Sequence, residues 1–113
     1  MNGQAGEFRV VLVTCGTLAE ARKIARSVVE KKLSACVNIL THAVESFYTW
    51  KGKVENSSEC LMILKTRAER LEELQKEVLR LHSYETPEFI ALTITAGSEG
   101  YLSWLSSCLT QGE

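Results

Sequence analysis

The sequence predicts an α+β domain with the element order β-α-β-β-α-β followed by a short C-terminal helix. Three observations predict this class. Strand-like runs occur at residues 8–14, 34–65 and 89–95, two stretches with helical periodicity separate them, and Lys51-Gly52 marks a hairpin turn in the middle run. This order is that of the ferredoxin-like, or split βαβ, sandwich, an antiparallel sheet with two helices on one face.

One domain accounts for the chain. Its 113 residues suit a single compact unit, and its 45% hydrophobic and 24% charged residues are typical of globular proteins. We expect the domain to span residues 8–109, with a flexible N-terminal segment at residues 1–7 and a C-terminal tail at residues 110–113.

The first strand, residues 8–14, ends at a Cys15-Gly16 turn. Thr17 then starts a helix, and Glu20 lies three residues further on, the spacing of a capping box in which each side chain binds the other residue's backbone N–H. Apolar residues at helical spacing continue to Val29, which predicts one buried helix face.

The middle of the chain predicts a long hairpin. Residues 34–50 are expected to form one long, irregular strand, and Gly52 can take the positive φ that a tight turn requires. Residues 53–65 then return antiparallel. Their centre, residues 60–64, is apolar throughout, which predicts burial on both faces of the sheet.

The second half repeats the pattern of helix and strand. Thr66 and Glu69 again have capping-box spacing, and Leu71, Leu74 and Val78 begin an apolar helical stripe. A loop follows at residues 82–88, then a strand at residues 89–95 and a terminal helix at residues 101–109.

The predicted fold leaves one face of the sheet without helices. If that face is apolar, other chains must bury it, because monomers rarely expose apolar patches of that size. A projecting hairpin with aromatic residues near its tip can also add strands to a neighbour. We therefore expect a homo-oligomer formed through the sheet faces and the 34–65 hairpin.

Composition excludes several classes of function. The 13 basic and 14 acidic side chains give no basic excess, so nucleic acid is not an expected partner. The longest strongly apolar run, residues 60–64, is far shorter than the roughly 20 residues of a membrane helix, so no direct membrane insertion is expected. The start of the chain lacks the pattern of a secretory signal, which favours the cytoplasm for the chain as given and leaves a longer organellar or secreted form open.

The motifs of common enzymes and zinc fingers are missing. The sequence has no P-loop, no G-x-S-x-G, no H-E-x-x-H and no Asp at all, and its four cysteines show no C-x-x-C spacing. No reaction is indicated, and the protein is expected not to be an enzyme. The thiols are expected to be reduced.

The best candidate for chemistry is the loop at residues 82–88, where His82, Tyr84, Glu85 and Glu88 surround the only proline. Imidazole and carboxylate groups can share a divalent ion, or they can position a proton donor and acceptor. The alternative is structural: His82 ends the helix, where a positive imidazole suits the dipole, and Tyr84 packs.

Three residues outside this loop are further candidates. Cys15 lies at a turn near a helix start, a setting that can lower a thiol pKa and favour reactivity or metal binding, although an inert buried cysteine fits equally well. Lys65 ends a buried strand, where it can bind an anion or pair with a glutamate. Trp50 is more often a packing residue than a ligand platform.

Several segments together resemble the CutA family of divalent-cation tolerance proteins. The matching segments are residues 11–15, 25–38, 46–55 (which resemble the family's W-x-G-K-[IV]-E), 59–66, 82–92 and 100–104. They lie in the right order and cover the chain from about residue 8 to residue 108. Two departures are Ser83, where the family usually has a proline, and Thr41-His42, which replace a proline-containing turn; Ser83 is expected to loosen the loop.

The resemblance implies a trimer of ferredoxin-like subunits similar to the PII signalling proteins, which binds divalent copper or related ions. His82 and Glu88 match positions proposed as metal ligands, and Cys15 lies close to a third. Lys65, Tyr84, Trp50 and, beside them, Glu85 are assigned to the cleft between subunits. Bacterial members are linked to metal tolerance, and mammalian ones to anchoring acetylcholinesterase in membranes.

The expected function is therefore non-enzymatic binding of a divalent cation, such as Cu2+, in metal tolerance, with no organic cofactor. Two alternatives remain open. One is a PII-like sensor that binds a small anion through Lys65 and backbone donors. The other is a trimeric adaptor that helps to anchor a membrane enzyme such as acetylcholinesterase.

Overall fold

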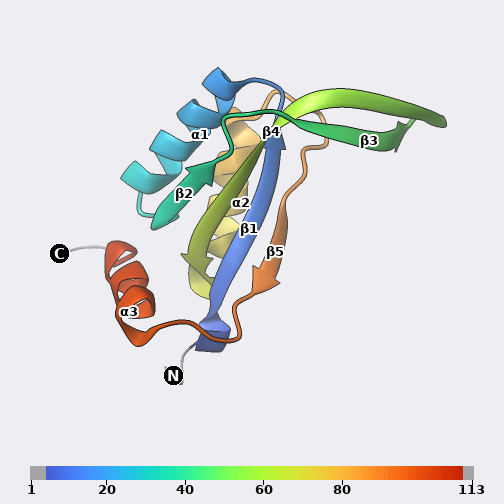
Figure 1. Cartoon of the computed structure of the whole chain (residues 1–113). Coiled ribbons are helices and arrows are strands. Elements are labelled where there is room, and N and C mark those ends of the chain that lie inside the picture. Colours follow the sequence, from blue (N-terminus) through green and yellow to red (C-terminus); the bar gives the residue numbers. More distant parts are fainter. Residues whose placement is uncertain (1–4, 111–113) are drawn as a thin grey trace.

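The computed structural model describes residues 5–110 and confirms the α+β class (Figure 1). A 3-10 turn at Ala5–Glu7 precedes the first strand, and a second one at Ala68–Arg70 precedes α2. The main elements are β1 Phe8–Cys15, α1 Leu18–Glu30, β2 Cys36–Ile39, β3 Val44–Trp50, β4 Lys53–Arg67, α2 Leu71–Leu81, β5 Ile90–Thr93 and α3 Glu99–Cys108. Most of the expected N-terminal segment and C-terminal tail lies outside the described residues.

The strands form one open antiparallel sheet in the order β2-β4-β1-β5. The inner half of β4 lies between β1 and β2. Its outer half pairs only with β3, so these two strands project from the domain as a hairpin (Figure 1). Lys51 and Gly52 both have positive φ, as the predicted turn requires.

The single long strand expected at residues 34–50 is wrong, because the chain forms two strands there. Ile39 pairs with Met62 and Val44 pairs with Glu59. Between these two pairs, the chain from β2 to β3 advances five residues while β4 advances three. Two extra residues are looped out between β2 and β3, which ends the first ladder and starts the second.

Both predicted capping boxes differ from the structure. Thr17 accepts a hydrogen bond from the backbone N–H of Glu20 at 3.1 Å, but the Glu20 carboxylate does not return to Thr17 and instead accepts from the backbone N–H of Ser83 at 3.0 Å. Thr66 is fully buried in β4, where its hydroxyl donates to the Leu33 carbonyl at 2.7 Å. It therefore caps no helix, and α2 begins only at Leu71.

The main core lies between the sheet and the pair α1 and α2. Its fully buried side chains include Val11, Val13, Ile24, Met62, Leu64, Leu74 and Val78. A smaller core under α3 contains Phe8, Ala35, Leu102, Leu105 and Leu109. The expected burial of residues 60–64 on both faces is wrong: Met62 and Leu64 are buried against the helices, whereas Leu61 and Ile63 on the other face remain partly exposed.

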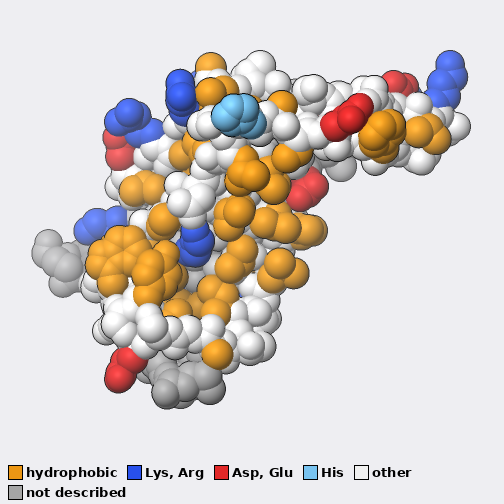
Figure 2. Space-filling view, in the orientation of Figure 1, with side chains coloured by type: hydrophobic (Ala, Val, Ile, Leu, Met, Phe, Trp, Pro, Cys, Tyr) orange, Lys and Arg blue, Asp and Glu red, His pale blue; other side chains and the backbone are white. Residues whose placement is uncertain are grey.

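The face of the sheet opposite α1 and α2 is largely apolar and open. Hydrophobic side chains gather on it over β1, β4 and β5 (Figure 2). Ile90 and Leu92 of β5 are 49% and 51% exposed, although their partners in register, Leu12 and Val10, lie in the middle of the sheet. Within the described residues, no helix is long and apolar enough to cross a membrane.

Candidate functional site

Cys15, Glu20 and His82 form a compact cluster of metal-ligand types. One ligand atom from each lies within 4.8 Å of the other two. Cys15 ends β1, Glu20 lies in the first turn of α1, and His82 directly follows α2. The short turn between β1 and α1 places the first two residues close together, whereas the packing of α2 beside α1 brings in the third.

The ring of His82 is buried and bonded at both nitrogens. Nε2 lies 2.7 Å from the carbonyl oxygen of Thr14, and the backbone N–H of Tyr84 donates to Nδ1 at 3.1 Å. Because a carbonyl oxygen can only accept, Nε2 carries the proton and Nδ1 carries the lone pair. The Glu20 carboxylate lies 3.2 Å from Nδ1. Binding of the other ring nitrogen to a backbone carbonyl is typical of histidines that ligate metals.

Cys15 is buried and its thiol donates to the sulfur of Met62 at 3.5 Å. Burial, and then the negative charges of Glu20 and other neighbours, raise the pKa of this thiol to about 12. Of the two alternatives for Cys15, the structure therefore favours the buried thiol over the one with a lowered pKa, because burial raises the pKa. A metal ion bound there has to displace the thiol proton.

Glu20 is the member of the cluster that sequence reasoning missed. Its carboxylate is held by the backbone N–H of Ser83, a donor that a proline at this position lacks. The departure from the family pattern at Ser83 thus supplies an anchor for Glu20. This hydrogen bond ties the loop to α1.

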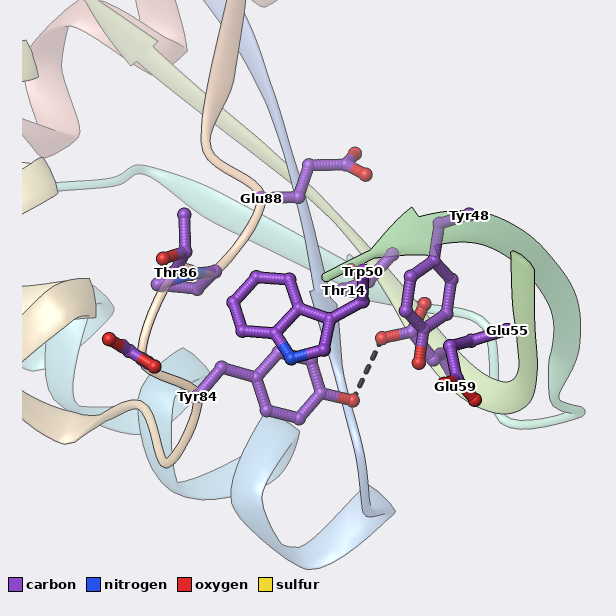
Figure 3. Close-up of a pocket in the computed structure, with 10 residues that line it drawn as sticks. Thr14, Tyr48, Trp50, Glu55, Glu59, Tyr84, Thr86 and Glu88 are labelled. Carbon is purple, nitrogen blue, oxygen red and sulfur yellow. Dashed lines mark hydrogen bonds between the residues drawn. The ribbon is translucent and has the colours of Figure 1, made fainter. Parts of the chain in front are cut away.

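Glu88 lies outside this cluster and lines a neighbouring hollow of about 680 Å³ (Figure 3). The lining residues are Thr14, Tyr48, Trp50, Glu55, Glu59, Tyr84, Glu85, Thr86, Pro87 and Glu88. Four predicted site residues, Trp50, Tyr84, Glu85 and Glu88, are thus brought together there. The hairpin supplies one side of the hollow and the segment after α2 supplies the other.

Carboxylates and aromatic rings dominate the hollow, and its lining contains no lysine or arginine. The Tyr84 hydroxyl donates to the Glu59 carboxylate at 2.8 Å (Figure 3), and burial together with this bond raises the pKa of Tyr84. Burial and the charge of Glu59 also raise the pKa of Glu88. The hollow is therefore suited to positive rather than negative ligands.

Lys65 does not line this hollow. It lies on the open face of the sheet, in register with Val10 of β1 and Cys36 of β2. Its ammonium donates to the side-chain oxygen of Asn38 and lies 4.0 Å from the Cys36 sulfur. The amide of Asn38 therefore takes the place of the expected glutamate partner. Within one chain, Lys65 also lies apart from the predicted cleft residues Trp50, Tyr84 and Glu85.

Comparison with known proteins places the chain among CutA proteins. Residues 9–108 match the family described as CutA1 divalent ion tolerance protein. The chain is 49% identical over 98 residues to the chloroplastic protein CutA of Arabidopsis thaliana, with 87% of this chain and 53% of that protein covered. It is 43% identical over 95 residues to the divalent-cation tolerance protein CutA of Archaeoglobus fulgidus, with 84% and 91% covered. It thus spans about half the length of the plant relative.

Solved structures show the same likeness. The periplasmic divalent cation tolerance protein CutA from Archaeoglobus fulgidus superposes with a TM-score of 0.88 at 40% identity, over 91% of this chain and 99% of that one. CutA from Xylella fastidiosa gives a TM-score of 0.89 at 32% identity, over 92% and 99%. The Archaeoglobus fulgidus protein is named for divalent-cation tolerance and not for an enzymatic reaction. The chain therefore belongs to the CutA1 divalent ion tolerance family.

Proposed function

We propose that this protein binds a divalent cation without catalysing a reaction, and that it does so in metal tolerance. The observation that carries the proposal is the cluster of Cys15, Glu20 and His82, whose ligand atoms lie within 4.8 Å of one another. A thiol, a carboxylate and an imidazole are the donor set that borderline ions such as Cu2+ and Zn2+ take in proteins. Thiolate and carboxylate together also balance the charge of a divalent ion.

The acidic hollow supports the same proposal. Its carboxylates, among them Glu59 and Glu88, lie beside the cluster because Thr14 and Tyr84 contact both sites. A wall of one sign of charge raises the local concentration of ions of the opposite sign. In this proposal Glu88, the ligand expected from the sequence, attracts the cation, while Glu20 completes the site.

We also propose that the chain acts as a ferredoxin-like, PII-like homotrimer. The exposed apolar face, with Ile90 and Leu92 at its edge strand, supports an assembly through the sheet. The projecting hairpin of β3 and β4 supports the addition of its strands to the sheet of a neighbouring chain. In such an assembly each chain contributes one cation site.

Neither alternative function has comparable support. The small-anion sensor is not favoured, because the hollow is lined by carboxylates and Lys65 lies elsewhere. No feature of residues 5–110 points to the adaptor for a membrane enzyme such as acetylcholinesterase.

The proposal can be tested by native mass spectrometry with zinc(II) at neutral pH. We expect a trimer that takes up three ions, with uptake lost in His82→Ala and weakened at least about tenfold in Glu20→Gln. Glu72→Gln is the matched control, because it removes an exposed carboxylate of α2 that lies outside both the cluster and the acidic hollow. Unchanged zinc uptake in both His82→Ala and Glu20→Gln would overturn the assignment.

A further inference from the structure

The thiol of Cys15 has a second sulfur as its hydrogen-bond acceptor, the thioether of Met62 at 3.5 Å. Cys15 ends β1, and Met62 lies on β4 opposite Val13, on the same helix-covered side of the sheet. Cys60 stands directly opposite Cys15 in the same ladder. Three sulfur atoms thus belong to one buried patch, beside the ring of His82.

The separation of the two sulfurs suits a shared metal ion. Two sulfurs bound at about 2.3 Å to one tetrahedral ion lie about 3.8 Å apart, as the tetrahedral angle requires. The observed 3.5 Å is shorter by only a few tenths of an ångström. In the present geometry the thiol proton lies between the sulfurs, so an ion can replace that proton with little movement of the strands.

The identity of these donors selects the class of ion. Thioether sulfur is a soft ligand that binds Cu(I) but contributes little to harder divalent ions. The lone pair of His82 Nδ1 supplies a third donor once it gives up the hydrogen bond from the Tyr84 backbone N–H, and Thr14 keeps the ring oriented. The charge balance favours the same class of ion. The charges of a monovalent ion and the Cys15 thiolate sum to zero, which a buried site tolerates. A divalent ion also needs the Glu20 carboxylate to reach zero net charge.

We infer that this cluster also binds a soft monovalent d10 cation, Cu(I) or its analogue Ag(I), through Cys15 Sγ, Met62 Sδ and His82 Nδ1. On binding, the S–H bond breaks, a sulfur–metal bond forms and the proton leaves to solvent past the Glu20 carboxylate; no electron is transferred. The inference uses the same cluster as the proposed function, but it adds Met62 and makes Glu20 dispensable. Both ions use Cys15 and His82, but the monovalent ion also needs Met62, whereas the divalent ion also needs Glu20.

The test is a titration of the intact, reduced protein with silver nitrate in chloride-free buffer, followed by native mass spectrometry and by calorimetry. We expect one Ag(I) per chain at this site. Met62→Leu, a volume-conserving core change, weakens the binding of silver at least about tenfold and leaves zinc binding unchanged. Glu20→Gln has the opposite pattern, weakening zinc and sparing silver. Cys15→Ser removes the silver site.

Two matched controls separate this site from general effects. Leu64→Met is a comparable change in the same buried strand that keeps Met62, and Cys36→Ser removes a thiol that lies outside the cluster; both should bind silver as the wild type does. Wild-type silver affinity in Met62→Leu, or loss of the bound silver in Cys36→Ser but not in Cys15→Ser, would overturn the inference. Silver binding that depends on Met62 in a protein that takes up no zinc would support the inference while refuting the proposed divalent function.

Discussion

The two faces of the β-sheet are built from the same strands but have different surroundings. On β4, Met62 and Leu64 are fully buried against α1 and α2, while Ile63 between them points to the open face and stays partly exposed. The helix-covered face holds the main core and the Cys15–Glu20–His82 cluster. The open face also carries apolar side chains, among them Ile90 and Leu92, with no helix of the described chain over most of it. The first face therefore stabilises the single chain, and the second is available for assembly.

The largest effect on stability is expected from a truncation on the helix-covered face. Leu64→Ala removes a fully buried side chain and should lower the free energy of unfolding by about 2–5 kcal/mol. Urea denaturation measures this change. Leu79→Ala is the matched control, because Leu79 lies on α2 but is 43% exposed, and it should cost less than about 0.5 kcal/mol. Equal costs for the two variants would contradict the division of the faces.

The open face is tested by placing a charge on it. Leu92→Lys should convert the proposed trimer to single chains, because a buried unpaired ammonium in an apolar interface is strongly unfavourable. Native mass and far-UV circular dichroism together measure the loss of assembly and the retention of the fold. Leu79→Lys introduces the same charge away from this face and should leave the assembly intact. A wild-type mass for Leu92→Lys would remove this face from the proposed interface.

A smaller effect is expected where α1 and α2 meet above the core. Hydrogen bonds from Arg80, Ser27 and Lys31 lower the pKa of Glu77 to about 2. Since the folded pKa lies below the ordinary value of 4.5, this stabilisation is complete above about pH 4.5 and is lost as the pH falls toward 2.

Glu77→Gln should therefore lower stability at neutral pH by about 1–3 kcal/mol and flatten the dependence of stability on pH between roughly 5 and 2. Thermal melting across this pH range measures both changes. Glu73→Gln, at an exposed carboxylate on the same helix paired with Arg70, is the control and should cost no more than about 1 kcal/mol. A steep acid transition retained in Glu77→Gln would contradict the role of this residue.

The smallest effect is expected at the rim of the hollow. Tyr84→Phe removes one hydrogen bond to Glu59 and should cost about 1 kcal/mol. Burial and Glu59 raise the pKa of Tyr84, and burial also raises the pKa of Tyr101, so late-ionising tyrosine should appear in a spectrophotometric titration. The part of this late step that belongs to Tyr84 should be missing in Tyr84→Phe. An unchanged titration would show that Tyr84 is not a late-ionising group.

Much of the fold and part of the site could be predicted from the sequence. The two helices, the Lys51-Gly52 turn and the uncovered sheet face followed from periodicity and turn chemistry, which act over a few residues. Cys15 and His82 were both predicted as site residues, and the structure brings them together. The third ligand was predicted as Glu88, whereas the structure places Glu20 beside them. The resemblance to the family gave Glu88 that role, whereas the capping-box spacing of Glu20 predicted only a structural role for it.

Short-range patterns in the sequence specify the helices, most of the strands and their apolar faces, because these properties are encoded within a few neighbouring residues. Long-range packing sets the break between β2 and β3, the burial of Thr66 in the sheet and the separation of Lys65 from the acidic hollow. It also brings Cys15, Glu20 and His82 together, since Thr14 and His82, which share a hydrogen bond, lie 68 residues apart. Contacts at that distance depend on strand register and on the packing of α1 and α2, and no local pattern specifies either one.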